Sequence, residues 1–225
     1  MTSFPNTDPN VLFFDDFLGQ SLDTSKWALA PRVNNRVGTN EIIVPSALSV
    51  DKSILTITAN QIDATHWNSG LISSYPGFLF TPPCKIEYCA QVAGGSALWN
   101  ILWSLDSTFT PGGGFIPEID ILESIGDPTV GFQTIHTALG VQQEVKVTNI
   151  GPGFHIYAVN FRTNQIDFLI DDQVTASYIP APSFVANPFY LIANLAVGGS
   201  FPGPITANTP PIAKLLIDWI KVSLI

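Results

Sequence analysis

Short apolar segments bounded by Gly, Pro, Asn or Asp recur along the whole chain and constrain its fold more than any other feature. Many alternate apolar and polar residues. In Ile54–Ala59, Leu55 and Ile57 would take one face of a strand and the neighbouring threonines the other. No segment with a helical period continues beyond two turns. The pattern therefore predicts an all-β protein.

The predicted strands are Val11–Asp15, Leu48–Val50, Ile54–Ala59, Gly70–Ser74, Cys84–Val92, Ala97–Ser104, Glu118–Glu123, Gln133–Leu139, Gln143–Val147, His155–Phe161, Gln165–Ile170, Tyr190–Val197 and Ala213–Val222. The 225 residues contain no internal repeat, linker or low-complexity run, which predicts a single domain over residues 1–225. We expect a β-jelly-roll sandwich of two antiparallel, curved sheets. Its concave face would form a cleft for an extended polymer.

The amino-acid composition limits the classes of molecule that the protein is expected to bind. Apolar residues make up 46% of the chain and charged residues only 12%, with a formal net charge of −9. This shortage of Lys and Arg argues against a nucleic acid, an anionic membrane surface or a sulfated polymer as partner. No apolar run approaches the length of a membrane span. We expect a monomer that binds a neutral polysaccharide.

The two cysteines, Cys84 and Cys89, fall in one predicted strand on opposite faces. That placement keeps their sulfurs too far apart for a disulfide. We expect two free thiols that pack as small apolar groups. The chain has no Cys/His cluster with zinc-site spacing.

The segment Pro117–Ser124 concentrates three acids in one predicted strand. Glu118 and Asp120 would share a face, and a one-residue β-bulge would bring Glu123 to that face as well. Carboxylates crowded together favour protonation of at least one of them. Two carboxyls with separated pKa values are what glycosidic bond cleavage requires. An exposed acidic strand or a cation site would explain this segment equally well.

The predicted sandwich suggests roles for other polar and aromatic residues. Trp99 and Trp103 would share one strand face. If exposed they would form a sugar-stacking platform, and if buried they would be ordinary core, which is the role that their residue type favours. His136 could assist an acid/base residue or simply bond within the structure. Asn40 and Asn194 could bind a ligand, although turn or backbone bonding is the commoner role of such residues.

Asp218 is an acid inside the apolar closing strand. A partly buried carboxylate needs a partner, which could be a basic residue, backbone amides or a cation.

The motif Glu118-Ile-Asp-Ile-Leu-Glu123 resembles the signature Glu-x-Asp-x-(x)-Glu of the family 16 glycoside hydrolases, the laminarinase and lichenase group. Further segments resemble the family in its own order. They are Phe14–Gly19, Leu22–Trp27, Thr39–Ile42, Trp99–Trp103, Phe154–Val159, Pro188–Gly203 and Leu216–Val222. The resemblance therefore covers almost the whole chain.

This resemblance implies retaining hydrolysis of internal β-glycosidic bonds through a covalent glycosyl-enzyme intermediate. Glu118 matches the nucleophile, Glu123 the acid/base, and Asp120 the carboxyl between them, which would hydrogen-bond Glu118. No cofactor is expected for the chemistry.

The remaining matches concern binding. Trp99 and Trp103 match tryptophans of the sugar cleft, which favours the stacking role, and Asn40 matches a sugar-binding asparagine. His136 matches a histidine near the acid/base, and Asp218 matches the aspartate of a structural calcium site on the convex side. We also count Asn194 among the substrate-binding residues. Members of the family are usually exported, which implies a secreted protein whose leader is absent from this sequence.

The six-residue motif resembles the laminarinase-like branch, so β-1,3- or β-1,3/1,4-glucan is the expected substrate. Several positions depart from the family pattern: Ile43, Leu71, Asn100, Ile101, Pro117 and Phe201. They put the detail of the cleft in question and leave the three carboxyls intact. The alternatives are a non-catalytic carbohydrate-binding jelly roll, a transglycosylase and a galactan hydrolase of the same family.

Overall fold

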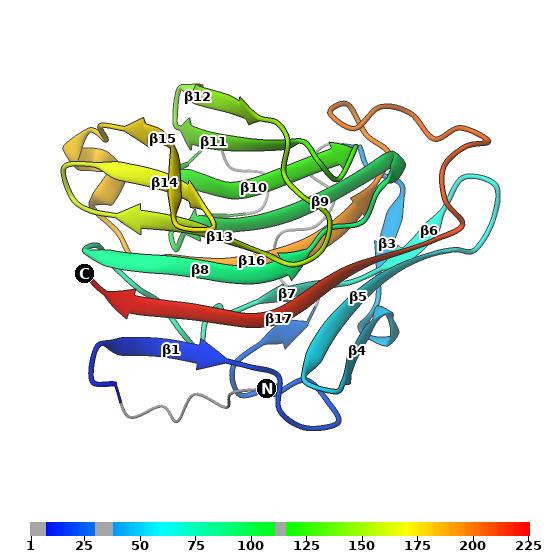
Figure 1. Ribbon diagram of the computed structural model, residues 1–225, viewed down its shortest axis with the longest axis horizontal. Coiled ribbons are helices and arrows are strands. Elements are labelled where there is room, and N and C mark those ends of the chain that lie inside the picture. Colours follow the sequence, from blue (N-terminus) through cyan, green and yellow to red (C-terminus); the bar gives the residue numbers. More distant parts are fainter. Residues whose placement is uncertain (1–7, 30–37, 111–115) are drawn as a thin grey trace.

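Two packed β-sheets make up the protein in the computed structural model, which describes residues 8–29, 38–110 and 116–225 (Figure 1). The larger sheet contains β1 (Val11–Asp15), β3 (Glu41–Ile43), β4 (Leu48–Asp51), β5 (Ile54–Gln61), β6 (Trp67–Ser69), β8 (Cys84–Gln91), β13 (His155–Phe161), β14 (Ile166–Ile170), β15 (Gln173–Tyr178) and β17 (Ile212–Leu224). The smaller contains β2 (Ala28–Leu29), β7 (Leu71–Ser73), β9 (Gly95–Asp106), β10 (Glu118–Gly126), β11 (Gly131–Thr137), β12 (Gly140–Val147) and β16 (Phe189–Val197).

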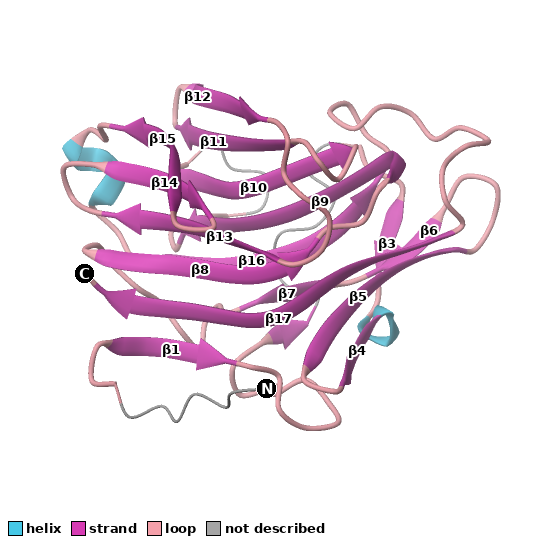
Figure 2. Ribbon diagram, viewed as in Figure 1, coloured by secondary structure: helices cyan, strands magenta, loops and turns pink. Residues whose placement is uncertain are grey.

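The predicted all-β jelly roll is confirmed. Among the described residues, helical structure is limited to two short 3-10 turns, η1 (Pro45–Ala47) and η2 (Pro182–Val185) (Figure 2). Strand order is β15-β14-β13-β8-β17-β5-β6-β3 in the ten-stranded sheet and β12-β11-β10-β9-β16-β7-β2 in the seven-stranded sheet. Pairing is antiparallel, as predicted, except that β3 runs parallel to β6. The chain passes through η1, β4 and β5 between those two strands, and this crossover permits the parallel pair.

All the predicted strands are present, with ends shifted by a few residues. Four short strands, β2, β3, β6 and β15, were not predicted. Within the described residues, no helix is long and apolar enough to cross a membrane.

The main core fills the space between the sheets. Leu55 and Ile57 of β5 are fully buried there, as the alternating pattern predicts, and Ile119 of β10 belongs to the same cluster from the other sheet. Cys84 also lies in this core, whereas Cys89 is on the opposite face of β8, and both thiols are free as expected. Burying this apolar surface is what holds the two sheets together.

A second, smaller apolar cluster covers the other face of the seven-stranded sheet. It consists of Leu71, Trp99, Ile101, Trp103, Leu105, Phe109, Tyr190, Ile192 and Ala196. We call this face, turned away from the main core, the cleft face.

Candidate active site

A bulge in β10 places three carboxyls on the cleft face. Against β11, Asp120 pairs with Thr134 and Glu123 pairs with Phe132, so β10 contains one residue more than its partner over this stretch. The extra residue lets Ile121 and Leu122 both enter the main core. Glu123 thereby returns to the side of Glu118 and Asp120, as the predicted bulge requires.

His136 of β11 approaches the first two acids of the motif. Its Nε2 lies 3.0 Å from Oδ2 of Asp120 and 4.0 Å from Oε1 of Glu118. The side chain of Asp120 is only 4% exposed, while those of Glu118 and His136 are 18% and 19% exposed. Glu118 therefore has access to a molecule on the cleft face, and Asp120 sits behind it against the imidazole.

Glu123 lies in a different environment from Glu118. The residue is 6% exposed, and its carboxyl accepts hydrogen bonds from Nε1 of Trp99 at 3.0 Å and from Oγ1 of Thr134 at 3.1 Å. Burial and the nearby charge of Asp120 raise its pKa to about 8, even though the two hydrogen bonds and His136 act in the opposite direction. At neutral pH this carboxyl is mostly protonated, so it can donate a proton.

Trp103 and Asn194 form a second pair on the cleft face. The indole Nε1 of Trp103 donates a 2.9 Å hydrogen bond to Oδ1 of Asn194 on β16, and both side chains are buried. Trp99 and Trp103 share a face of β9, as predicted. Both are buried in the apolar cleft-face cluster, as the expectation from residue type alone had it, and the sugar-stacking role stays a prediction.

Two neighbours of the acid/base candidate were not predicted. Thr134 alternates with His136 on β11, so the same period-two argument that selected His136 could have found it. Phe132, one more step along, packs edge to face against Phe201 at 5.3 Å, and Phe201 packs in the same way against Trp99 at 5.5 Å. These aromatic rings build a wall beside Glu123.

Asn40 lies just before β3, on a different segment from the three carboxyls of β10. Its Nδ2 donates to the carbonyl of Thr65 at 3.1 Å and its backbone N–H to the carbonyl of Val197 at 2.7 Å. These contacts match the turn-bonding role that the sequence left open.

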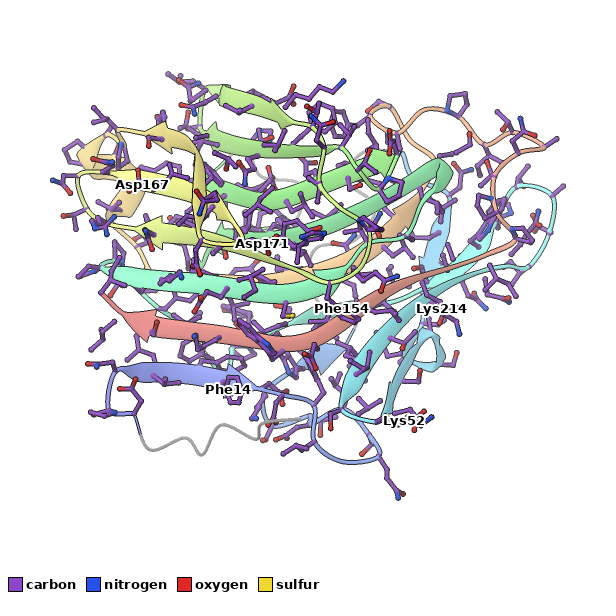
Figure 3. The ribbon with its side chains drawn as sticks, viewed as in Figure 1. Phe14, Lys52, Phe154, Asp167, Asp171 and Lys214 are labelled. Atoms are coloured by element: carbon purple, nitrogen blue, oxygen red, sulfur yellow. The ribbon has the colours of Figure 1, made fainter. Side chains whose placement is uncertain are left out.

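Asp218 also lies away from the carboxyls of β10, on β17 at a register shift between Ile217 and Trp219. Figure 3 looks onto this outer face of the ten-stranded sheet, with Phe14 of β1 and Lys214 of β17 labelled. Burial and the charge of Asp16 raise the pKa of Asp218, whose Oδ2 lies 3.9 Å from the Cys89 sulfur. Two neighbouring acids suit a hard cation such as Ca²⁺, which binds through oxygen.

The cleft face could itself hold a cation. Glu118, Asp120 and His136 offer ligand atoms that lie within 4.8 Å of one another. Among the described residues this group of three is the only one of its kind, and Asp218 is not part of such a group. The geometry therefore permits metal binding as well as acid/base chemistry.

The chain is similar to several known proteins. The family model described as glycosyl hydrolases family 16 matches residues 41–221. The chain is 28% identical over 88% of its length to an endo-1,3-1,4-beta-glycanase of Rhizobium meliloti, and 25% identical over 98% to a keratan-sulfate endo-1,4-beta-galactosidase of Sphingobacterium multivorum. It spans 43% and 56% of the length of these two relatives. Among solved structures, the laminarinase from Flavobacterium sp. UMI-01 is 25% identical, with a TM-score of 0.83 over 95% of this chain and 99% of that one.

Proposed function

Because the chain belongs to the glycosyl hydrolases of family 16, we propose that it cleaves internal β-glycosidic bonds of a neutral glucan, with β-1,3- or mixed β-1,3/1,4-glucan as substrate. The glucanase and laminarinase names of its relatives support this substrate class. The net charge of −9 supports a neutral polymer over a sulfated one.

The observation that carries the proposal is the contrast between two carboxyls on one strand. Glu118 is partly exposed next to His136, whereas Glu123 is buried against Trp99 and Thr134 with a pKa raised to about 8. One group suits a nucleophile and the other a proton donor at the same pH. A cation bound at Glu118 would neutralise the negative charge that the nucleophile needs, so family membership favours hydrolysis over metal binding.

We propose a retaining mechanism in two steps. A carboxylate oxygen of Glu118 attacks the anomeric carbon while the bond to the leaving oxygen breaks and Glu123 gives that oxygen its proton. Water then attacks the same carbon, Glu123 takes a proton from the water, and the bond to Glu118 breaks. Retention requires carboxyls about 5–5.5 Å apart, and the β10 bulge favours such a spacing by bringing both acids to one face.

His136 and Asp120 would serve the nucleophile. The imidazole is 3.0 Å from Asp120 and within 4.0 Å of Glu118, so it can hold the position of both acids. The hydrogen bond between Asp120 and Glu118 stays a prediction. Trp103 is held by Asn194 and is only 6% exposed, so a sugar next to the scissile bond would contact only the uncovered edge of its ring.

The substrate panel that tests the proposal contains laminarin, mixed-linkage β-glucan, xyloglucan, agarose, carrageenan and keratan sulfate, with release of reducing ends as the signal. We expect cleavage of the first two, and none by a Glu118→Gln variant. Cleavage of a galactan alone would contradict the substrate and keep the chemistry. Binding without cleavage would favour a carbohydrate-binding jelly roll, and products longer than the starting oligosaccharide would favour a transglycosylase.

We also propose that Asp218, with Asp16 beside it, contributes to a structural Ca²⁺ site that takes no part in the chemistry. Asp218→Asn keeps the shape of the side chain and removes its charge. Ca²⁺ should raise the Tm of the wild type relative to EDTA and have a smaller effect on the variant, because an ion that binds only the folded state stabilises it. An equal Tm with Ca²⁺ and with EDTA would contradict the site.

Single-domain organisation over residues 1–225, a monomeric state and export remain predictions. A single cooperative unfolding transition tests the first, and size-exclusion chromatography with light scattering tests the second. Fractionation of the source cells tests the third.

A further inference from the structure

The two hydrogen bonds to the Glu123 carboxyl come from groups of different chemistry. Trp99 offers an indole N–H, which can only donate, and it occupies Oε1 at 3.0 Å. Thr134 offers a hydroxyl, which can donate or accept, and its Oγ1 lies 3.1 Å from Oε2. Oε1 is therefore an acceptor in both ionisation states of the carboxyl, whereas Oε2 can carry a proton and still keep a hydrogen bond.

The bulge in β10 is what brings Thr134 to this oxygen. Thr134 pairs with Asp120 across the two strands, and Glu123 pairs with Phe132. Residues that are diagonal to each other on one face of an antiparallel pair lie within reach of a long side chain. The side chain of Glu123 reaches Thr134, two residues along β11 from its own partner. Strand register thus fixes the hydroxyl beside the carboxyl.

Burial restricts the bonding partners of both groups. Thr134 is 1% exposed and Glu123 is 6% exposed. Among the described residues, the Thr134 hydroxyl makes its one hydrogen bond with Glu123, and the Glu123 carboxyl bonds only Thr134 and Trp99. The hydroxyl is therefore committed to the carboxyl that we assign as acid/base.

The titratable groups on the cleft face around Glu123 come from three strands, β10, β11 and β12: Glu118, Asp120, His136, Glu144 and Lys146. On β12, Glu144 lies opposite Thr134 and Lys146 lies opposite Phe132, and both are exposed. Burial is the main cause of the raised pKa of Glu123, followed by the charge of Asp120. These groups act on Glu123 through their charge, while Thr134 acts through a hydrogen bond to one oxygen.

The hydroxyl can serve Glu123 in both steps of the proposed mechanism. In the free enzyme, the protonated Oε2 can donate to Oγ1 of Thr134. When Oε2 gives its proton to the leaving glycosidic oxygen, the hydroxyl turns and donates to the carboxylate that forms. In the second step the attacking water returns a proton to Oε2, and the hydroxyl can accept again.

We propose that Thr134 is a positioning residue of the acid/base, whose hydroxyl holds Oε2 of Glu123 as the oxygen that gives and takes the proton. This inference rests on the proposed function, since it concerns the acid/base group of that reaction. A residue of the same shape without a hydroxyl would fill the position and leave Oε2 without its partner.

Thr134→Val keeps the branched shape and removes the hydroxyl, whereas Thr134→Ser keeps the hydroxyl. On laminari-oligosaccharides we expect Thr134→Val to lower kcat/KM about tenfold, equal to about 1.4 kcal/mol of transition-state stabilisation, because the carboxylate that forms loses a donor. A 2,4-dinitrophenyl glycoside of a β-glucan disaccharide has a leaving group that departs without a proton. Its kcat/KM should change less than about twofold in Thr134→Val. Thr134→Ser should keep the wild-type values on both substrates.

Thr58→Val is the matched control, because Thr58 lies on β5 in the other sheet with its side chain turned away from the main core. It should behave as the wild type does, and the Tm of each variant shows whether it is folded. If a folded Thr134→Val lost activity equally on both substrates, or lost none on either, the positioning role would be overturned.

Infrared difference spectroscopy observes the same carboxyl without turnover. Subtracting the spectrum of Glu123→Gln isolates the C=O band of protonated Glu123, whose disappearance as pH rises gives the pKa. This pKa should be higher in Thr134→Val and unchanged in Thr134→Ser, because a hydrogen bond to a carboxylate is stronger than one to the neutral acid.

The frequency of that band tests which oxygen carries the proton. If the proton is on Oε2, Oε1 is the carbonyl oxygen, so Trp99→Phe should raise the C=O frequency more than Thr134→Val does. The reverse order would place the proton on Oε1 and overturn the assignment. A wild type that gives the expected spectra and cleaves neither substrate would keep the hydrogen-bond assignment and overturn the hydrolase.

Discussion

The indole Nε1 of Trp99 donates a 3.0 Å hydrogen bond to Oε1 of Glu123. A residue of the cleft-face cluster thus holds the carboxyl that we assign as acid/base, and Thr134 binds its second oxygen. Packing on the cleft face and proton transfer therefore depend on the same side chain.

Replacing Trp99 by Phe removes that hydrogen bond and keeps an aromatic ring. Since the bond lowers the pKa of Glu123, its loss should raise that pKa and move the basic limb of the pH–activity curve to higher pH. We expect kcat/KM to fall by about two- to tenfold, because a hydrogen bond between neutral groups contributes about 0.5–1.5 kcal/mol. Trp219→Phe, on the other sheet, is the control. A basic limb that stays in place would contradict the role of the indole.

The wild-type pH profile follows from the same carboxyl. Glu123 donates a proton only in its protonated form, so kcat/KM should decline above pH 8, where its pKa of about 8 lies. The slope should approach about tenfold per pH unit. Initial rates on laminarin over a pH series measure it, and a flat profile across this range would contradict the assignment.

Glu123→Gln should change stability in a pH-dependent way. The folded state raises the pKa from 4.5 to about 8, so it binds the proton more tightly than the unfolded state does. The stability linked to Glu123 is fully present below about pH 4.5 and is lost as pH rises through about 8. Gln does not titrate, so the variant's Tm should gain on the wild type as pH rises. A Tm difference that does not change with pH would count against a buried, protonated Glu123.

The pair of Trp103 and Asn194 is suited to a double-mutant cycle. Asn194→Ala leaves the buried indole N–H without its acceptor, which should cost about 1–3 kcal/mol of unfolding free energy. Trp103→Phe removes the donor. Urea unfolding of both single variants and the double variant should give a coupling energy of about 0.5–3 kcal/mol. Strictly additive effects would show that the hydrogen bond contributes nothing.

Local patterns predict the arrangement of β10 well. Alternation puts Glu118 and Asp120 opposite Ile119, and the odd position of Glu123 calls for the bulge that β10 contains. The same reasoning applied to β11 would have added Thr134.

Contacts between residues far apart in the chain could not be predicted from the sequence. The contact between Trp99 and Glu123 depends on the register of β9 against β10, which shifts twice along the pair. The role of Asn40 depends on Thr65, which is 25 residues away. The missed strands β2, β3 and β6 have only two or three residues, too few to show a period.

The most direct test of the central claim is to label the enzyme covalently with an activated 2-deoxy-2-fluoro glycoside of a β-glucan disaccharide and to identify the labelled residue. Its fluorine slows hydrolysis of the glycosyl-enzyme, so intact-mass analysis and peptide mapping can locate the sugar. We expect one glycosyl unit per chain, attached to Glu118, and none on Glu118→Gln. A label on any other residue, or an active enzyme that never acquires one, would contradict a retaining mechanism with Glu118 as nucleophile.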